Sequence, residues 1–142
     1  MATLQLTNPR LVSGNVATGN SAVAINAGQL ITLDSDYKLI LADAGEATTY
    51  QCEGIALNGG EIGDKIAYAT DGAIMEFDNM NNTTWGTNWW VSNEGGAAEN
   101  YNDMSNGEYL FNIARTWGCT KRVKLIFVDF AVVKGTLPSS CS

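Results

Sequence analysis

The sequence predicts a single all-β domain: a small β-sandwich or β-barrel over residues 28–142, preceded by an extended N-terminal arm over residues 1–27. Short β-permissive runs recur along the chain and are separated by turns rich in Gly, Asn and Asp. No helix-length amphipathic pattern competes with these runs. The length of 142 residues suits one domain with one core.

Composition indicates a soluble globular protein. Hydrophobic residues make up 45% of the chain and charged residues 16%, a balance that excludes general disorder. No apolar run approaches the roughly 20 residues that span a bilayer, so we expect no membrane partner. Residues 1–7 lack the basic start and apolar stretch of a secretory signal, so we expect the product to be made in the cytoplasm.

The net charge of −7 is unevenly distributed. Residues 1–110 carry a net charge of −11, and residues 111–142 carry +4 with Asp129 as their only acid. The phosphate backbone of nucleic acid would repel so acidic a protein, so we expect no nucleic-acid partner.

Cysteine and histidine usage limits the chemistry. Cys52, Cys119 and Cys141 cannot all pair within one chain and lack metal or redox spacing, so we expect free thiols. The chain has no histidine, which excludes histidine-dependent catalysis. No pair of acids stands out for glycoside hydrolysis. We therefore expect no enzyme activity, no cofactor and no metal site.

Residues 1–27 are mostly small and polar, with Arg10 as their only charge. One hypothesis is an arm that adds a strand to a sheet edge on another protein. Its contact residues would be Leu4, Leu6, Arg10, Leu11 and Val12. The alternative is a flexible terminus or a first strand of the protein's own sheet.

Two strand groups are predicted in the middle of the chain. Residues 30–33 and 39–42 form a hairpin whose turn contains Asp34 and Asp36. These aspartates suit a turn better than a calcium loop, which would need different residues at its fifth and sixth positions. Residues 54–57, 65–70 and 73–77 follow one another as a three-stranded meander, with Met75 and Phe77 on its buried face.

Residues 78–108 are the most loop-like part and contain Trp85, Trp89 and Trp90. Exposed rings there would bind a sugar or a protein partner. Alternatively, alternation sends one of Trp89 and Trp90 into the core and the other outward. Of these hypotheses we favour core packing combined with a partner contact.

The last third is the most strand-like: residues 109–117, a turn, then residues 121–134. Both faces of the second strand are apolar. A domain of this size cannot easily cover both, so the surplus face is expected to meet either another chain, as an oligomer interface, or the N-terminal arm. Its residues are Ile126, Val128, Phe130 and Val132.

Four segments resemble the head decoration (cement) proteins of tailed bacteriophages: residues 27–34, 38–44, 54–58 and 63–72. A weaker similarity covers residues 89–96 and 107–114, and Tyr37 stands where a turn glycine is expected. The resemblance implies a virion protein on the outer capsid surface. It also implies a homotrimer that clamps the major capsid protein after the shell expands.

Three functional classes compete. The resemblance, the acidic composition and the surplus apolar face favour a structural virion protein. The alternative is a carbohydrate-binding or adhesive module on the virion surface that uses the Trp85, Trp89 and Trp90 cluster. An enzyme is the weakest hypothesis.

Overall fold

The structure, a computed structural model, describes residues 3–4, 6–78, 88–100, 104, 106–116 and 122–135. These residues form twelve β-strands and no helix. The strands make two sheets in which all paired strands are antiparallel. The prediction of a small all-β domain is confirmed.

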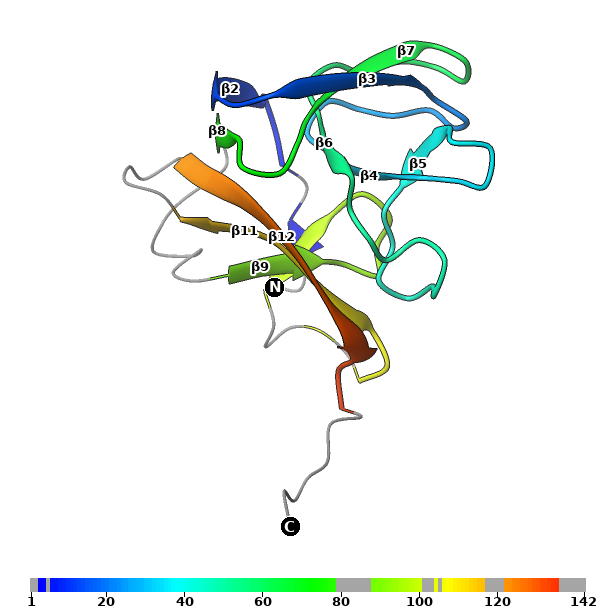
Figure 1. The fold of residues 1–142 in the computed structure, drawn as a ribbon, viewed down its shortest axis with the longest axis vertical. Coiled ribbons are helices and arrows are strands. Elements are labelled where there is room, and N and C mark those ends of the chain that lie inside the picture. The colour runs from blue at the N-terminus through cyan, green and yellow to red at the C-terminus, as the bar shows by residue number, and fades with distance from the viewer. Residues whose placement is uncertain are drawn as a thin grey trace.

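One sheet has seven strands and the other five. In spatial order the first contains β1 (Thr3–Leu4), β10 (Ala98–Asn100), β9 (Asn88–Val91), β11 (Tyr109–Thr116), β12 (Arg122–Val133), β8 (Ile74–Glu76) and β2 (Arg10–Ser13). The second contains β3 (Val16–Asn20), β7 (Lys65–Ala69), β6 (Gly54–Ala56), β4 (Leu30–Leu33) and β5 (Leu39–Leu41). Figure 1 shows the five-stranded sheet at the upper right, with β9, β11 and β12 below it.

Two predicted hairpins are present. β4 pairs with β5, and the long strands β11 and β12 pair with each other. The Asp34 carboxylate closes the first turn, since its Oδ1 accepts hydrogen bonds from the N–H groups of Asp36 (2.8 Å) and Lys38 (2.9 Å). This geometry agrees with the turn interpretation of the aspartates.

The predicted meander is wrong at its third strand. β6 pairs with β7, but β8 lies in the other sheet between β12 and β2. The turn before β8 contains Gly72 at φ 90°, and the N–H of Gly72 donates to Leu125 O of β12 (2.8 Å). The Asp71–Gly72 turn therefore carries the chain from one sheet to the other. The buried positions of Met75 and Phe77 were predicted correctly.

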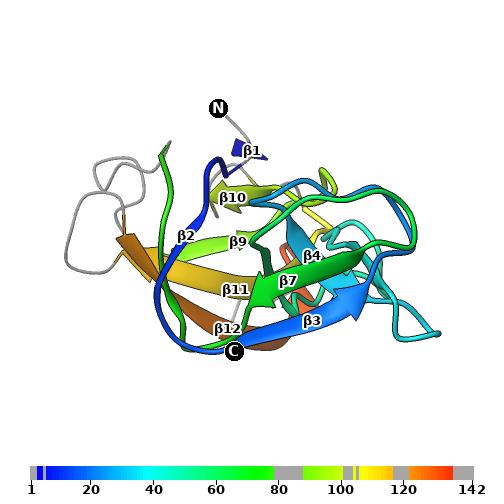
Figure 2. The same cartoon turned by 90° about the horizontal axis from the view of Figure 1, so that it is seen from above.

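A second crossing between the sheets occurs at Gly14, between β2 and β3 (Figure 2). Gly14 has φ 119°, and a side chain there would collide with Ala73. β2 pairs with β8 in the first sheet, and β3 pairs with β7 in the second. The antiparallel pair formed by these two chain segments therefore bends from one sheet into the other. Strands that switch sheets in this way form the corners of two-layer β folds.

The three strands described in the N-terminal segment pair within the fold. β1 pairs with β10, β2 with β8 and β3 with β7. These pairings agree with the alternative hypothesis that residues 1–27 contribute strands to the protein's own sheets. An arm separated from the domain at residue 27 is not seen among the described residues.

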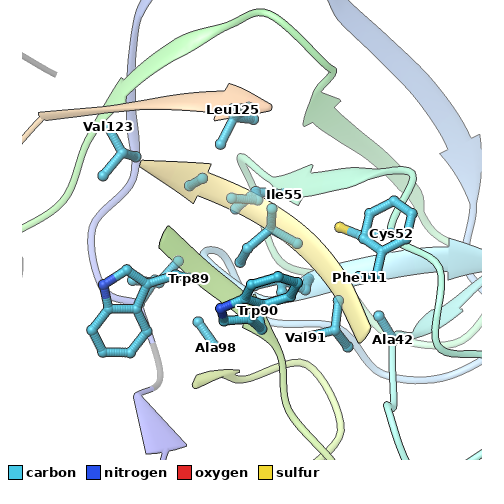
Figure 3. Close-up of a cluster of buried hydrophobic side chains, with 14 of the residues drawn as sticks. Ala42, Cys52, Ile55, Trp89, Trp90, Val91, Ala98, Phe111, Val123 and Leu125 are labelled. Carbon is cyan, nitrogen blue, oxygen red and sulfur yellow. The ribbon is translucent and has the colours of Figure 1, made fainter. Parts of the chain in front are cut away.

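Two hydrophobic clusters stabilise the domain. The larger contains residues of both sheets, including Ile55 of β6 beside Trp90 and Phe111 (Figure 3). The smaller one is formed by the five-stranded sheet and includes Leu39 and Ile66. Cys52 is a free buried thiol, as expected, and burial raises its pKa to about 12. Cys119 and Cys141 lie outside the described residues.

Candidate partner-binding surface

Strand β12 carries exposed apolar side chains. Val128 is 43% exposed and Phe130 is 49% exposed, while Ile126 is half-buried. Val132 does not belong with them, because it packs against the larger hydrophobic cluster. Val128 and Phe130 form a surface that we call the β12 patch. A register shift between Leu125 and Val128 interrupts the alternation that grouped Ile126 with them.

A bulge in β12 explains the inward position of its last residues. Between the pairs Phe111–Asp129 and Tyr109–Val133, β12 has two more residues than β11. Ala131, within this stretch, has a left-handed backbone with φ 57°. A left-handed residue interrupts the extended backbone on which strand alternation depends, so a strict two-residue period does not hold beyond residue 130.

Asp129 holds the bulge in place. Its Oδ1 accepts a hydrogen bond from the Ala131 N–H (2.8 Å), and its Oδ2 accepts from Tyr50 Oη (2.8 Å) and Gln51 Nε2 (2.7 Å). Partial burial acts to raise the pKa of Asp129, but these hydrogen bonds outweigh it, so the pKa lies below 3.8. The charged form therefore stabilises the fold above about pH 3.8, and this contribution is lost as the pH falls through the lowered pKa.

Ala131→Gly is expected to stabilise the protein by about 0.5–1 kcal/mol. The left-handed backbone costs an L-residue roughly 1–2 kcal/mol, whereas glycine loses only about 0.5–1 kcal/mol of additional conformational entropy. Ala67→Gly in β7 is the control, since Ala67 has an ordinary backbone and the change should destabilise. Urea unfolding measures the free energy of unfolding of both variants. A destabilising effect of Ala131→Gly would contradict this account of the bulge.

The tryptophans of β9 are not at the surface. Trp89 and Trp90 are both buried, which corrects the predictions of an exposed cluster and of one outward ring. β9 is an interior strand, and residues on both of its faces are covered. The Trp90 and Phe130 rings pack edge to face with their centroids 5.2 Å apart, so the β12 patch contacts the core directly. Trp85 lies outside the described residues.

Two of the five predicted arm residues serve the fold instead. Leu6 is buried in the larger cluster, and Arg10 forms ion pairs within the chain. Leu11 and Val12 are exposed on the edge strand β2. Leu4 lies in β1, which pairs with β10.

The ion pairs of Arg10 fasten β2 to β8. Its guanidinium contacts Glu76 at 2.9 Å and Asp78 at 2.8 Å, and Arg122 of β12 contacts Glu76 from the other side at 3.2 Å. Hydrogen bonds from Arg10 and then Arg122 lower the pKa of Glu76 below 4.5. Arg10 therefore forms its ion pairs within its own chain, which weakens the prediction that it binds a capsid.

Sequence reasoning missed the two most exposed large apolar side chains in the part of the chain that the structure describes. Tyr37, in the β4–β5 turn, is 81% exposed, and Ile62, in the β6–β7 turn, is 73% exposed. Turn residues are usually polar or small, so an apolar residue at each turn was the available signal. Tyr37 carried a second sequence signal, because it stands where a turn glycine is expected. The structure gives it a left-handed backbone with φ 62°.

The described residues contain no pocket and no group of three or more side chains that could hold a metal. A helix able to span a membrane is likewise not found in this part of the chain. No protein-family model matches the sequence, and no curated protein matches it.

Proposed function

We propose that this protein is a structural virion protein that decorates the outer surface of a phage capsid and stabilises it by bridging capsid subunits. One observation carries the proposal. The four segments that resemble decoration proteins, residues 27–34, 38–44, 54–58 and 63–72, contain β4, β5, β6 and β7. These are adjacent strands of one sheet, so the resemblance covers a connected structural unit.

The β12 patch supports self-association as part of this function. An apolar pair such as Val128 and Phe130 on a rigid strand gains free energy when a partner removes it from water. Phe130 is anchored against Trp90, so little side-chain entropy is lost on binding. In this proposal, copies of the chain associate as a homotrimer through this patch.

Charge supports the outer surface over the capsid lumen. The chain carries −7 overall, and an acidic protein inside the shell would lie against negatively charged DNA. The partners in this proposal are the major capsid protein and further copies of the chain. No catalytic role is included.

Carbohydrate binding is the weaker candidate. Sugar recognition by aromatic residues needs accessible ring faces, and Trp89 and Trp90 are buried. What remains of this hypothesis depends on Trp85. A glycan array is its direct test.

Heating phage heads with and without the protein tests the proposal. A protein that binds the assembled shell and not its separated subunits shifts disassembly to higher temperature by mass action. At a free concentration of 100 times Kd, each bound copy contributes about 2.7 kcal/mol. DNA release, followed with an intercalating dye, is expected at a higher temperature in decorated heads. Equal release temperatures would contradict the proposal, and an unrelated acidic protein of similar size is the control.

A further inference from the structure

We propose that Tyr37 and Ile62, at two turns of the five-stranded sheet, are the anchors with which the protein docks on a basic protein surface. This inference rests on the proposed function and identifies that surface as the capsid shell. The two side chains with their exposed neighbours Asp36 and Glu61 are called the turn-tip surface below. Both turns lie at the same end of the molecule, on the right of Figures 1 and 2.

The backbone around Ile62 is held in one conformation. Asp64 N–H donates to Glu61 O (3.0 Å), and the Asp64 carboxylate accepts the Glu61 N–H (2.8 Å). Gly63, with φ 91°, donates its N–H to Ser21 O (2.8 Å). An apolar side chain exposed on so constrained a turn is already placed for binding, because little backbone entropy remains to be lost.

The Tyr37 turn is constrained in the same way. Tyr37 N–H donates to Asp34 O (3.0 Å), and Asp34 N–H donates to Lys38 O (2.8 Å). The Asp34 carboxylate accepts two further N–H groups of the turn. Tyr37 has a left-handed backbone that glycine would adopt without strain. A tyrosine in this backbone conformation lowers the local stability of the turn, and such an outlier points to a role outside the fold.

Ser21 joins the two turns. This buried residue donates its Oγ–H to Glu61 O (2.7 Å) and its N–H to Asp64 O (2.9 Å). It also forms a bridge with Leu39, two residues after Tyr37. The two anchors are therefore fixed relative to each other by hydrogen bonds on both sides of one residue.

Charge decides which partner fits. The two turns and the strand residue that follows the second one contain four acids against two lysines: Asp34, Asp36, Glu61, Asp64, Lys38 and Lys65. Two copies facing each other through this surface would bring net negative charge together, which disfavours a second copy as the occupant. A complementary partner has Lys or Arg side chains around recesses that accept a phenol ring and a branched aliphatic group.

Cosedimentation with phage heads purified without this protein tests the inference. Tyr37→Gly is expected to weaken binding by about tenfold or more, as the loss of an anchor residue does. Its melting temperature should stay the same or rise, because the backbone strain is relieved. Ile62→Ser should weaken binding with little effect on melting. Asp36→Lys should weaken it through charge. Val16→Ser is the matched control, since Val16 is 47% exposed on the same sheet but away from these turns.

The outcomes separate the two proposals. Failure of the unsubstituted protein to sediment with heads would overturn the capsid function, and this inference with it. If the unsubstituted protein sediments and Tyr37→Gly and Ile62→Ser bind equally well, the turn-tip surface is overturned and the capsid function stands. Weaker binding by these two variants, with Val16→Ser unchanged, supports the inference.

Discussion

Deleting residues 2–20 is expected to unfold the protein. The deletion removes β1, β2 and β3, and with them the buried Leu6 side chain. A buried Leu→Ala change alone costs about 2–5 kcal/mol, against a total stability of roughly 5–15 kcal/mol for a domain. Circular dichroism should therefore show no cooperative melting. A truncated protein that melts cooperatively would restore the arm hypothesis.

Two glycines allow the dependence of stability on the docked N-terminal segment to be measured by point substitution. Gly28 has φ 94° and Gly107 has φ 96°, so an alanine at either position meets the same backbone strain of roughly 1–2 kcal/mol. At Gly28 the new Cβ would also overlap the carbonyl oxygen of Leu6, whereas nothing lies within 4 Å at Gly107. Gly28→Ala should be the more destabilising by several kcal/mol in urea unfolding. Equal effects would show that Leu6 is not docked there.

Val128→Asp is expected to convert the proposed trimer into monomers. An unpaired carboxylate buried in an interface costs about 3 kcal/mol or more, a factor of roughly 100 or more in association. Folding should change little, because Val128 is exposed in the single chain. Light scattering at micromolar concentration measures the mass.

The control for this substitution is Val16→Asp. Val16 is a valine of similar exposure on β3, in the other sheet. Val16→Asp should leave the mass of the assembly unchanged. If Val16→Asp dissociates the protein and Val128→Asp does not, the interface lies along the β3 edge and the β12 patch is excluded.

Sequence pattern predicted the elements whose causes are local. The hairpins β4–β5 and β11–β12 follow from short turns between apolar runs, and Asp34 closes its turn through its own neighbours. The burial of Met75 and Phe77 follows from strand alternation. In each case the signal lies within a few residues of the feature.

Features that depend on distant contacts could not be predicted in this way. The move of β8 into the other sheet depends on pairing with β12, about 50 residues away in the chain. The inward position of Val132 depends on a bulge held by Tyr50 and Gln51. Leu6 looked available for a partner because its core position is created by strands much later in the sequence.

The candidate site was predicted only in part. Val128 and Phe130 are exposed as expected, whereas Trp89 and Trp90 are buried because β9 is an interior strand. Tyr37 and Ile62 were missed, since their significance depends on exposure and on constrained turns. Exposure of single turn residues is a property of the assembled fold.

Electron microscopy of virions tests the central claim most directly. Under the proposed function, heads of a phage that carries the gene for this protein should be reconstructed with the protein and after that gene is deleted. The account predicts protrusions on the outer surface that accommodate this fold, contact more than one capsid subunit through the Tyr37 and Ile62 turns, and disappear in the deletion. Identical outer surfaces in the two reconstructions would contradict it.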